Sequence, residues 1–323
     1  MVMELGRNYC IIFVIYFLFL APLTSFAMGL KKQHTTWDTR IVDQNYKICV
    51  LGDTGSGSKH QYQVAQALKQ EGCNQVRIVG DVIYPKGLKN KNDPQFVDKF
   101  INPYHEVIQS ELKPKFFIAL GNHDYDGNTK AWRQLHQDDG FLFSPHRYYA
   151  ETYKNSNVCI ATLDTSPFDS LKHFLKVFGH GSWIRKRTRE FQKNCEFSIA
   201  FAHHPYINSG HHGDARAFLK RFLKRNIIGH FDLYIAGHQH FLSDEGQKQS
   251  TSLYISGAGG ASLHEEPTHN PEGGFASSTP GYLVITLNRN SEQKIVAHTR
   301  FKTVTDNGVT TVHEKMVVGK GIR

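Results

Sequence analysis

The sequence lacks several features that would point to a small disulfide-rich protein or a zinc-ribbon protein. It has only five cysteines in 323 residues and no Cys-x-x-Cys pair, which argues against a zinc ribbon and a thioredoxin-like redox site. It has no internal repeat and no low-complexity tract. Its one long apolar run, Ile11–Ala21, is shorter than the roughly 20 residues that a membrane helix needs.

That run has the layout of an export signal. Arg7 precedes it, and Ser25-Phe26-Ala27 follows as a small-x-small cleavage site, so residues 1–27 are predicted to be a signal peptide. An uncleaved signal anchor is the alternative. We expect a secreted or periplasmic protein, or one in the lysosomal or secretory pathway of a eukaryote. We also expect a monomer without stable membrane insertion once the signal is removed.

Export makes disulfides possible, and four cysteines remain after the signal. Cys49 and Cys159 lie inside strand-like runs and are interpreted as buried free thiols. Cys73 and Cys195 each precede a strand-like run and could pair, but the sequence leaves this open.

The formal net charge is +9, which could steer small anionic substrates toward the protein. The densest basic cluster, Trp183–Glu190, is predicted to be the solvated face of a helix. No nucleic-acid-binding motif is recognisable, so no specific nucleic-acid partner is expected.

Strand-like and helix-like segments alternate after a polar stretch at residues 28–45, which is interpreted as a linker. This alternation predicts an α/β protein with a parallel sheet, and later apolar runs predict a second sheet packed on the first. A catalytic domain is expected at 46–300, followed at 301–323 by a loose tail or a hairpin turning at Asn307-Gly308. Strands are predicted at 46–52, 75–80, 115–120, 158–163, 197–202, 233–236, 253–256 and 282–287, and helices at 59–71 and 95–112.

The glycine-rich stretch Gly52–Lys59 comes close to a phosphate-binding loop. In that motif a lysine follows the last glycine directly, but here Ser58 stands between Gly57 and Lys59. A dinucleotide-binding fingerprint also fails, because its third glycine is missing. The loop is therefore interpreted as a turn that carries Asp53, a hard oxygen ligand suited to a metal.

Polar residues follow most of the predicted strands. Ligands of open α/β sheets collect where strands release their carboxyl ends, so these residues are expected to converge on one place. They are Asp53, Asp81, Asn122, Asp164, His203 and His238.

These motifs, in their order along the chain, resemble the calcineurin-like metallophosphoesterases. The resemblance spans about Lys47–Leu287 and implies two packed mixed β-sheets flanked by helices, a four-layer α/β/β/α sandwich. Most members carry a metal-binding histidine two residues after the first aspartate, where this chain has Gly55. Tyr84, three residues after Asp81, stands in for it, which is similar to the purple acid phosphatases of the tartrate-resistant type.

The resemblance implies two metal sites that share the bridging carboxylate of Asp81. Fe(III) would be held by hard donors, and Fe(II), Zn(II) or Mn(II) by an amide oxygen and two imidazoles. The first site would comprise Asp53, Tyr84, His240 and Asp81, and the second Asn122, His203, His238 and Asp81.

The implied activity is hydrolysis of phosphomonoesters through attack by a hydroxide held on the metals. His123 is the expected proton donor, and Asp124 is expected to orient it. His212 matches a second histidine of the family, although His211 beside it keeps that assignment open. His204 is expected to support the site or the structure.

Two other functions stay open. A phosphodiesterase or nucleotidase could use the same metals. A non-hydrolytic iron protein in redox or reactive-oxygen chemistry would keep the ligands but would not need His123 or His212.

Overall fold

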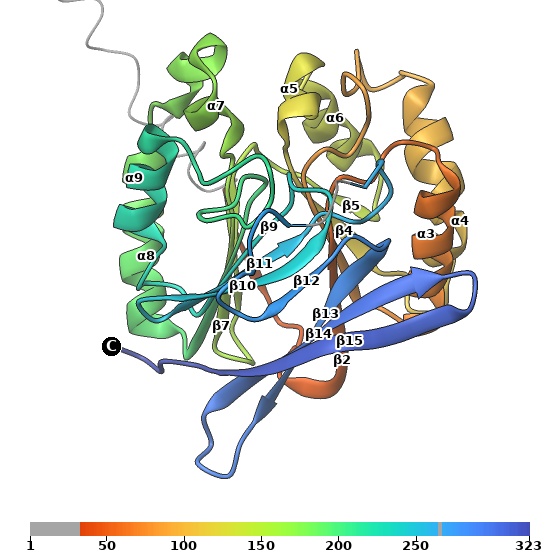
Figure 1. The fold of residues 1–323 in the computed structure, drawn as a ribbon. Coiled ribbons are helices and arrows are strands. Elements are labelled where there is room, and N and C mark those ends of the chain that lie inside the picture. Colours follow the sequence, from red (N-terminus) through yellow and green to blue (C-terminus); the bar gives the residue numbers. More distant parts are fainter. Residues whose placement is uncertain (1–32, 264–266) are drawn as a thin grey trace, which may run out of the picture.

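The computed structural model describes residues 33–263 and 267–323. Two β-layers pack face to face and helices cover the outer face of each, which gives the α/β/β/α arrangement of Figure 1 and confirms the expected fold class. The signal peptide expected at residues 1–27 lies outside the described residues. Within those residues, no helix combines the length and the apolar character needed to cross a bilayer.

One β-layer joins a parallel sheet to an antiparallel ribbon. The two parts meet where Val42 and Leu287 form a parallel bridge beside β2 and β13. The parallel part runs β2 (Asp43–Leu51), β3 (Gln75–Val79), β4 (Lys115–Ala119) and β5 (Leu142–Phe143). The ribbon consists of β13 (Gly281–Arg289), β14 (Ile295–Thr305) and β15 (Gly308–Val318).

The other β-layer is an eight-stranded mixed sheet in the order β1-β6-β7-β8-β9-β11-β10-β12. Its centre, β7 to β9 and β11, is parallel. Toward the edges, β6 is antiparallel to β7, β10 is antiparallel to β11 and β12, and the edge strand β1 pairs in parallel with β6. The strands are β1 (His34–Trp37), β6 (Tyr149–Tyr153), β7 (Val158–Thr162), β8 (Phe197–Phe201), β9 (Leu233–Ala236), β10 (Leu242–Lys248), β11 (Thr251–Ser256) and β12 (Phe275–Ser277).

The helices lie on the two outer faces and along one edge of the sandwich. α3 and α4 cover the layer that contains β2 to β5, and α8 and α9 cover the eight-stranded sheet (Figure 1). Val50 and Val79 of one layer pack with Ile199 of the other in the apolar core between the sheets. The helices are α3 (Lys59–Glu71), η1 (Val97–Ile101), α4 (Asn102–Ile108), α5 (Asn122–Asp126), α6 (Lys130–Asp138), α7 (Ser166–Asp169), η2 (Leu171–Val177), α8 (His180–Asn194) and α9 (Ala217–Asn226).

Helix α3 shows how the local sequence sets an element's limits. Ser58 caps its start by accepting a hydrogen bond from the Gln61 backbone N–H, and Gly72 ends it at φ 71°. That left-handed conformation costs glycine little. Val64 and Leu68, four residues apart, face the core. The helix therefore has the bounds that its sequence predicts.

Some elements differ from the expectation. Part of the stretch interpreted as a linker forms β1, which pairs in parallel with β6 at the edge of the larger sheet. The predicted helix 95–112 begins instead as the π-helical turn η1 and continues as α4, with Pro103 in the first turn, where its missing N–H costs nothing. A C-terminal hairpin is present, but its two turn residues are Asp306-Asn307.

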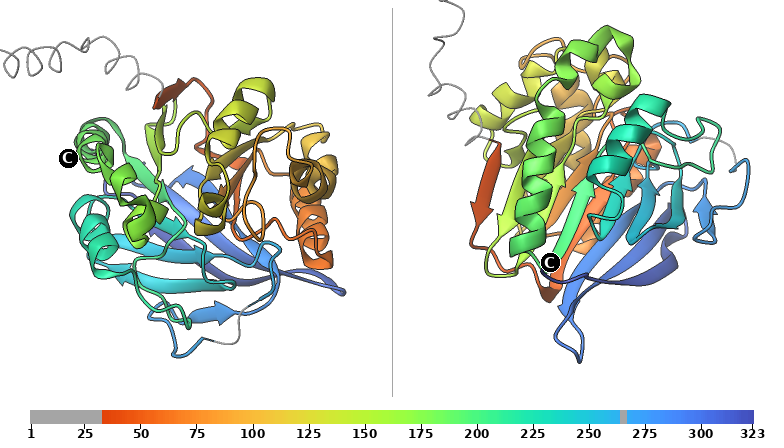
Figure 2. Two further views of the ribbon diagram at one scale, coloured as in Figure 1. Left: turned by 90° about the horizontal axis from the view of Figure 1, so that it is seen from above. Right: turned by 90° about the vertical axis from the view of Figure 1, so that its left-hand side faces the viewer.

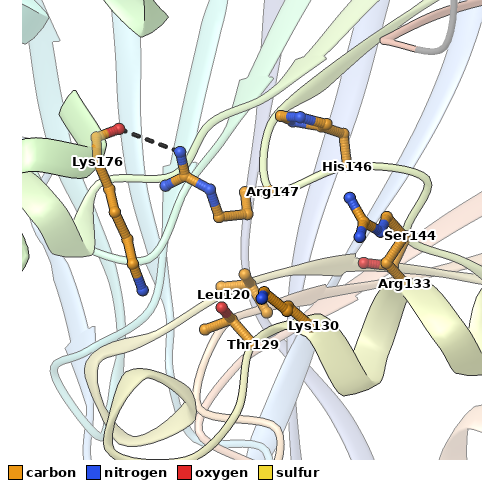
Figure 3. A pocket seen from close by; sticks show the side chains of 8 residues that line it. All are labelled: Leu120, Thr129, Lys130, Arg133, Ser144, His146, Arg147 and Lys176. Atoms are coloured by element: carbon orange, nitrogen blue, oxygen red, sulfur yellow. Dashed lines mark hydrogen bonds between the residues drawn. The ribbon is translucent and has the colours of Figure 1, made fainter. Parts of the chain in front are cut away.

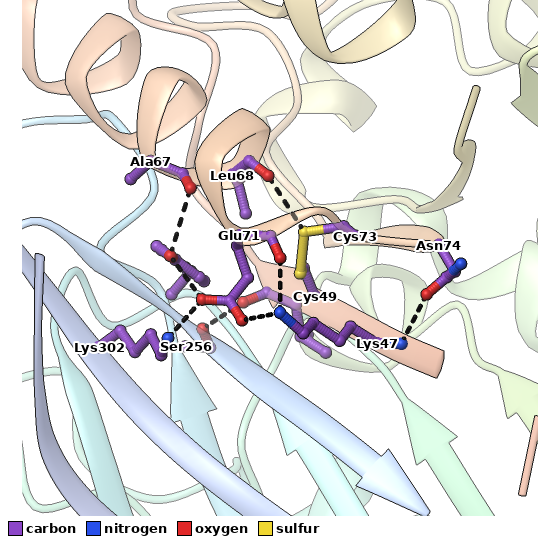
Figure 4. Close-up of a disulfide and its surroundings, with 11 residues drawn as sticks. Lys47, Cys49, Ala67, Leu68, Glu71, Cys73, Asn74, Ser256 and Lys302 are labelled. Atoms are coloured by element: carbon purple, nitrogen blue, oxygen red, sulfur yellow. Dashed lines mark hydrogen bonds and ion pairs between the residues drawn. A yellow bond between two sulfur atoms is a disulfide. The ribbon is translucent and has the colours of Figure 1, made fainter. Parts of the chain in front are cut away.

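The cysteines form two disulfides, so the interpretation of Cys49 and Cys159 as free thiols is wrong. Cys49 bonds to Cys73 and Cys159 to Cys195. In each pair one cysteine lies in a strand, and the other precedes the neighbouring parallel strand by a short step. Figure 4 shows the first bond at the end of α3. The strand register brings these partners together, which the sequence alone does not reveal.

A buried ion pair joins the two β-layers. The Arg77 guanidinium, on β3, donates to both carboxylate oxygens of Glu151, on β6, at 2.9 Å each. The side chains are 2% and 0% exposed. Tyr153 also donates to Glu151, at 2.8 Å. The pair is therefore desolvated and satisfied by a fixed set of hydrogen bonds.

Candidate metal centre

The carboxyl ends of strands from both β-layers meet at one edge, seen from above in Figure 2. Asp53 follows β2, Asp81 follows β3, Asn122 follows β4, His203 follows β8 and His238 follows β9. The convergence expected from strand-end positions is therefore present for these five residues.

The first group of donors surrounds the Tyr84 phenol. Its Oη lies 3.1 Å from Asp53 Oδ1, 3.0 Å from Asp81 Oδ2 and 2.9 Å from His240 Nε2. Asp53 and Asp81 are almost fully buried. Two buried carboxylates, a phenol oxygen and an imidazole nitrogen thus face one point, an arrangement that suits a hard trivalent cation.

The second group surrounds the side-chain oxygen of Asn122. Asn122 Oδ1 lies 2.9 Å from His203 Nε2 and 3.1 Å from His238 Nδ1, and these two nitrogens are 3.2 Å apart. Asp81 Oδ2 lies 3.3 Å from His203 Nε2. The carboxylate oxygen that faces Tyr84 therefore faces the second group too.

The imidazole tautomers fit metal ligands. His203 Nδ1 is 2.9 Å from the Val79 carbonyl oxygen, and His240 Nδ1 is 2.6 Å from the Ser262 carbonyl oxygen. A carbonyl oxygen can only accept, so each Nδ1 carries a proton, which leaves Nε2 as the nitrogen that can bind a metal. Metal-binding histidines usually have this second hydrogen bond, which fixes the tautomer.

Charge in the pocket makes a cation favourable. Burial lowers the pKa of the His203 imidazole, but the Asp81 carboxylate outweighs burial and raises that pKa to about 9. Burial, with the carboxylates of Asp53 and Asp81, raises the pKa of the Tyr84 phenol well above its ordinary value. Without a metal, protons hold the positions that a metal would take, so metal binding would release them.

The backbone is strained where it presents these donors. Asp53, Asp81 and His238 have φ values of 56°, 50° and 71°. Residues other than glycine rarely adopt this left-handed backbone conformation, which costs on the order of 1–3 kcal/mol at each residue. Such strain gathers at functional sites, where the surrounding structure holds the chain in place.

Two positions must be glycine, because neighbouring atoms lie too close to leave room for a Cβ. A Cβ on Gly55 would lie 1.8 Å from the Val82 carbonyl oxygen, and a Cβ on Gly121 would lie 2.1 Å from Asp81 Oδ1. The Gly55 carbonyl also accepts the Tyr84 backbone N–H at 2.8 Å. The position at which most of the family carries a histidine thus has no room for a side chain, and it packs against the segment that supplies Tyr84.

His123 lies at the edge of the two groups. Its backbone N–H donates to Asp81 Oδ1 at 2.9 Å, and its Nδ1 lies 2.7 Å from the Pro85 carbonyl oxygen. The expected orientation of His123 by Asp124 is not observed. The buried Asp124 carboxylate accepts backbone N–H groups of Gly121 and Val82 instead, so it fixes the loop rather than the ring.

The other histidines of the region differ from one another in the residues that they contact. The His212 ring stacks on His238, with centroids 4.6 Å apart, whereas His211 Nδ1 lies 3.3 Å from the Gln239 amide nitrogen. His204 Nδ1 lies 3.0 Å from the Thr165 hydroxyl.

A cavity of about 280 Å³ opens beside Asn122 and His238, and His212 and Arg216 line it. Its contents could therefore reach both the candidate ligands and His212.

The roles of Gln239 and Thr165 were not foreseen. Gln239 Oε1 accepts the His212 backbone N–H at 3.3 Å, and the Thr165 hydroxyl accepts the His204 backbone N–H at 3.1 Å. Gln239 stands between the two histidines of the Gly-His-x-His motif, which was the one available hint. Thr165 directly follows Asp164, one of the strand-end residues singled out in the sequence, but no sequence pattern indicated its contact with His204.

The glycine-rich loop does not form a phosphate cradle. Ser56 and Ser58 both donate their hydroxyls to the Gly260 carbonyl oxygen, at 2.7 and 2.6 Å. Lys59 forms an ion pair with Asp306 at 3.0 Å. The side chains that would hold a phosphate have other partners, which agrees with the interpretation of the loop as a support for Asp53.

Comparison with known proteins agrees with this geometry. Residues 46–242 match the model of the calcineurin-like phosphoesterase family. The chain belongs to this family. Purple acid phosphatases are among the relatives that sequence comparison finds, which agrees with the resemblance drawn from the tyrosine at position 84.

Two related sequences and one solved structure illustrate the similarity to known proteins. Purple acid phosphatase 7 of Arabidopsis thaliana is 27% identical over 67% of this chain and 71% of its own. Tartrate-resistant acid phosphatase type 5 of Rattus norvegicus is 23% identical over 61% of this chain and 64% of its own. The structure of GAP50, the anchor in the inner membrane complex of Plasmodium, superposes with a TM-score of 0.70 at 22% identity, covering 86% of this chain and 90% of that chain. This last similarity concerns the fold.

Proposed function

We propose that this calcineurin-like phosphoesterase is an exported acid phosphatase that hydrolyses small phosphomonoesters at a dinuclear metal centre. The main support is the position of Asp81 Oδ2, which lies within 3.3 Å of donor atoms from both groups. One carboxylate shared by two donor sets is suited to a pair of metal ions held close together.

The donor chemistry supports a different ion at each of the two sites. Asp53, Tyr84 and His240, with Asp81, would hold Fe(III), because two carboxylates and a phenolate are hard anionic ligands. The second set, Asn122, His203 and His238 with the same Asp81, would hold Fe(II), Zn(II) or Mn(II). When bound, such a pair lowers the pKa of a coordinated water and stabilises the charge of the phosphoryl group.

His123 would act on the leaving group. Since its Nδ1–H donates to the Pro85 carbonyl, Nε2 is the nitrogen that can give a proton to the departing alkoxide. The backbone N–H of the same residue donates to Asp81 Oδ1, which keeps His123 next to the carboxylate that both donor groups share. Asp124 supports this position through the loop backbone.

His212 and the small cavity favour a compact anionic substrate. The His212 ring covers His238 at one side of the site, where it could bind a phosphate oxygen. The cavity volume, about 280 Å³, is slightly below the roughly 300–1,000 Å³ found for sites of drug-sized ligands. Small phosphate esters fit this space better than extended polymers.

The two disulfides support export. Such bonds persist in secreted proteins, the secretory pathway and the periplasm, and they are rare in the cytosol. The signal peptide expected at residues 1–27 would bring the chain to such a compartment.

A substrate comparison tests the proposal. The purified, metal-analysed protein should hydrolyse p-nitrophenyl phosphate faster than bis(p-nitrophenyl) phosphate in mildly acidic buffer, and a chelator should abolish both reactions. Faster cleavage of the diester would favour a phosphodiesterase. A protein that binds iron but cleaves neither ester would point to the non-hydrolytic alternative.

A further inference from the structure

A second cavity lies apart from the metal-ligand groups, and its lining is strongly basic. It measures about 190 Å³ and is enclosed by the start of α6, the loop between β5 and β6, and η2 (Figure 3). Leu120 at the end of β4 also lines it. Its polar lining comprises Thr129, Lys130, Arg133, Ser144, Arg147 and Lys176, together with His146.

Positive charge in this cavity exceeds what nearby carboxylates neutralise. Arg147 is paired with the buried Asp164 at 2.6 Å. Lys130, Arg133 and Lys176 form no ion pair within residues 33–263 and 267–323. Three cations thus remain around one small space.

Arg147 and Lys176 are held at the cavity wall. Arg147 Nη2 donates to the Lys176 carbonyl oxygen at 3.1 Å, as Figure 3 shows. The Lys176 ammonium lies 4.5 Å above the centre of the Tyr125 ring. These contacts keep one wall of the basic lining in place before any ligand arrives.

The start of α6 adds to the positive potential. Its first turn contains no acidic residue, although acidic side chains are the ones that a helix N-terminus stabilises. It carries Lys130 and Arg133 instead, whose charges oppose the helix dipole. Helix stability gives no reason for this arrangement, whereas an anion at this end would interact favourably with the dipole and both cations.

Ser144 supplies an unused hydroxyl. The residue is 3% exposed and lines the cavity. Its side chain makes no hydrogen bond to the described part of the chain. The hydroxyl oxygen itself is not a buried, unsatisfied atom but is accessible from the cavity, where it can donate a hydrogen bond to a ligand oxygen.

His146 shows how strongly the cavity favours negative charge. Burial, with the positive charges of Arg147 and Arg133, lowers the pKa of this imidazole to about 4. His146 is therefore neutral in mildly acidic solution, and the excess charge comes from the lysines and arginines.

We propose that this cavity is a second anion site, which binds a phosphate group separately from the metal centre. Lys130, Arg133 and Lys176 supply the charge, and Ser144 donates a hydrogen bond. The volume is below the roughly 300 Å³ at which sites for drug-sized ligands begin, so a single phosphate group fits better than a whole nucleotide. The phosphate could be free, or it could be the second phosphate of a substrate.

Phosphate stoichiometry tests the site in the holoenzyme. Equilibrium dialysis with labelled inorganic phosphate would compare wild type with Lys130→Ala/Arg133→Ala. The matched control is Arg185→Ala/Lys186→Ala, which removes the same two residue types from the exposed face of α8. We expect two bound phosphates in wild type and control but one in the cavity variant, whose second site should weaken at least about tenfold per cation lost.

The outcomes separate this site from the proposed function. One phosphate in all three proteins, or two in the cavity variant, would overturn the second site. One in wild type and none in the cavity variant would keep the cavity site but remove phosphate binding from the metal centre. The charge-conserving variant Lys130→Arg/Arg133→Lys should keep wild-type stoichiometry, which shows that lost charge and not misfolding causes the effect.

Steady-state kinetics distinguish the two sources of phosphate. If the cavity receives a substrate's second phosphate, KM for bisphosphoglycerate should rise about tenfold in the Lys130→Ala/Arg133→Ala variant. KM for glycerol phosphate should stay unchanged. If neither KM changes while a phosphate is lost in dialysis, the ligand is free phosphate.

Discussion

Replacement of His123 by alanine tests the proposed chemistry most directly. The variant removes the ring whose Nδ1 bonds to the Pro85 carbonyl and whose centroid lies 4.5 Å from that of Tyr84. The backbone hydrogen bond from residue 123 to Asp81 does not need the ring. The metal-ligand geometry should therefore survive, and only the proton donor is lost.

The size of the loss should depend on the leaving group. A positioned proton donor contributes roughly 10²–10⁴-fold to the rate, so kcat for glycerol phosphate, whose alkoxide needs a proton, should fall by about that factor. p-Nitrophenolate is a far weaker base and leaves almost unaided, so its kcat should fall by only about tenfold or less. Steady-state assays on both substrates with metal-analysed protein measure this difference.

His105→Ala provides the control, since His105 is an exposed histidine on α4. It should keep wild-type rates on both substrates. An equal loss on both substrates in His123→Ala would mean that the ring does not protonate the leaving group. Unchanged rates would remove His123 from the mechanism.

Three further predictions concern colour, stability and pH. Tyr84→Phe should abolish the visible absorption of iron-loaded protein at unchanged iron content, because the phenolate ligand is gone; a surviving band would exclude Tyr84 as its source. Arg77→Met leaves Glu151 buried without its partner, so urea unfolding should show a loss of about 3–5 kcal/mol, most of it recovered in Arg77→Met/Glu151→Leu. Burial, although opposed by Arg147, raises the pKa of Asp164 to about 6, above its unfolded value of about 3.9. The native state then holds the extra proton between about pH 4 and 6, so the free energy of unfolding should decline by about 3 kcal/mol as pH rises through that window. Asp164→Asn should lack this decline, and a parallel decline in that variant would refute the assignment.

Elements with strong local determinants were predictable from the sequence. Helix α3 has its cap at Ser58 and its glycine stop at Gly72, and the structure gives it the expected bounds. β9, a short apolar run, also has the expected limits. β1 was missed because its polar sequence, His-Thr-Thr-Trp, becomes a strand only by pairing with β6.

The site was predictable in composition but not in detail. Positions at the ends of predicted strands identified the residues that lie at the site, because the carboxyl ends of parallel strands lie at one edge of a sheet. The left-handed backbone of Asp53 and His238, the Pro85 carbonyl that holds His123, and the disulfide partners depend on contacts between distant segments. Those contacts leave no local pattern in the sequence.

The candidate ligands come from both β-layers, and this has a consequence for the lifetime of the protein. Asp53, Asp81 and Asn122 follow strands of one layer, whereas His203 and His238 follow strands of the other. Metal ions bound by these residues would link the two β-layers. Because the ions would bind the folded chain and not the unfolded one, a higher metal concentration would lower the unfolded fraction. Loss of metal would then shorten the lifetime of the folded protein as well as lower its catalytic rate.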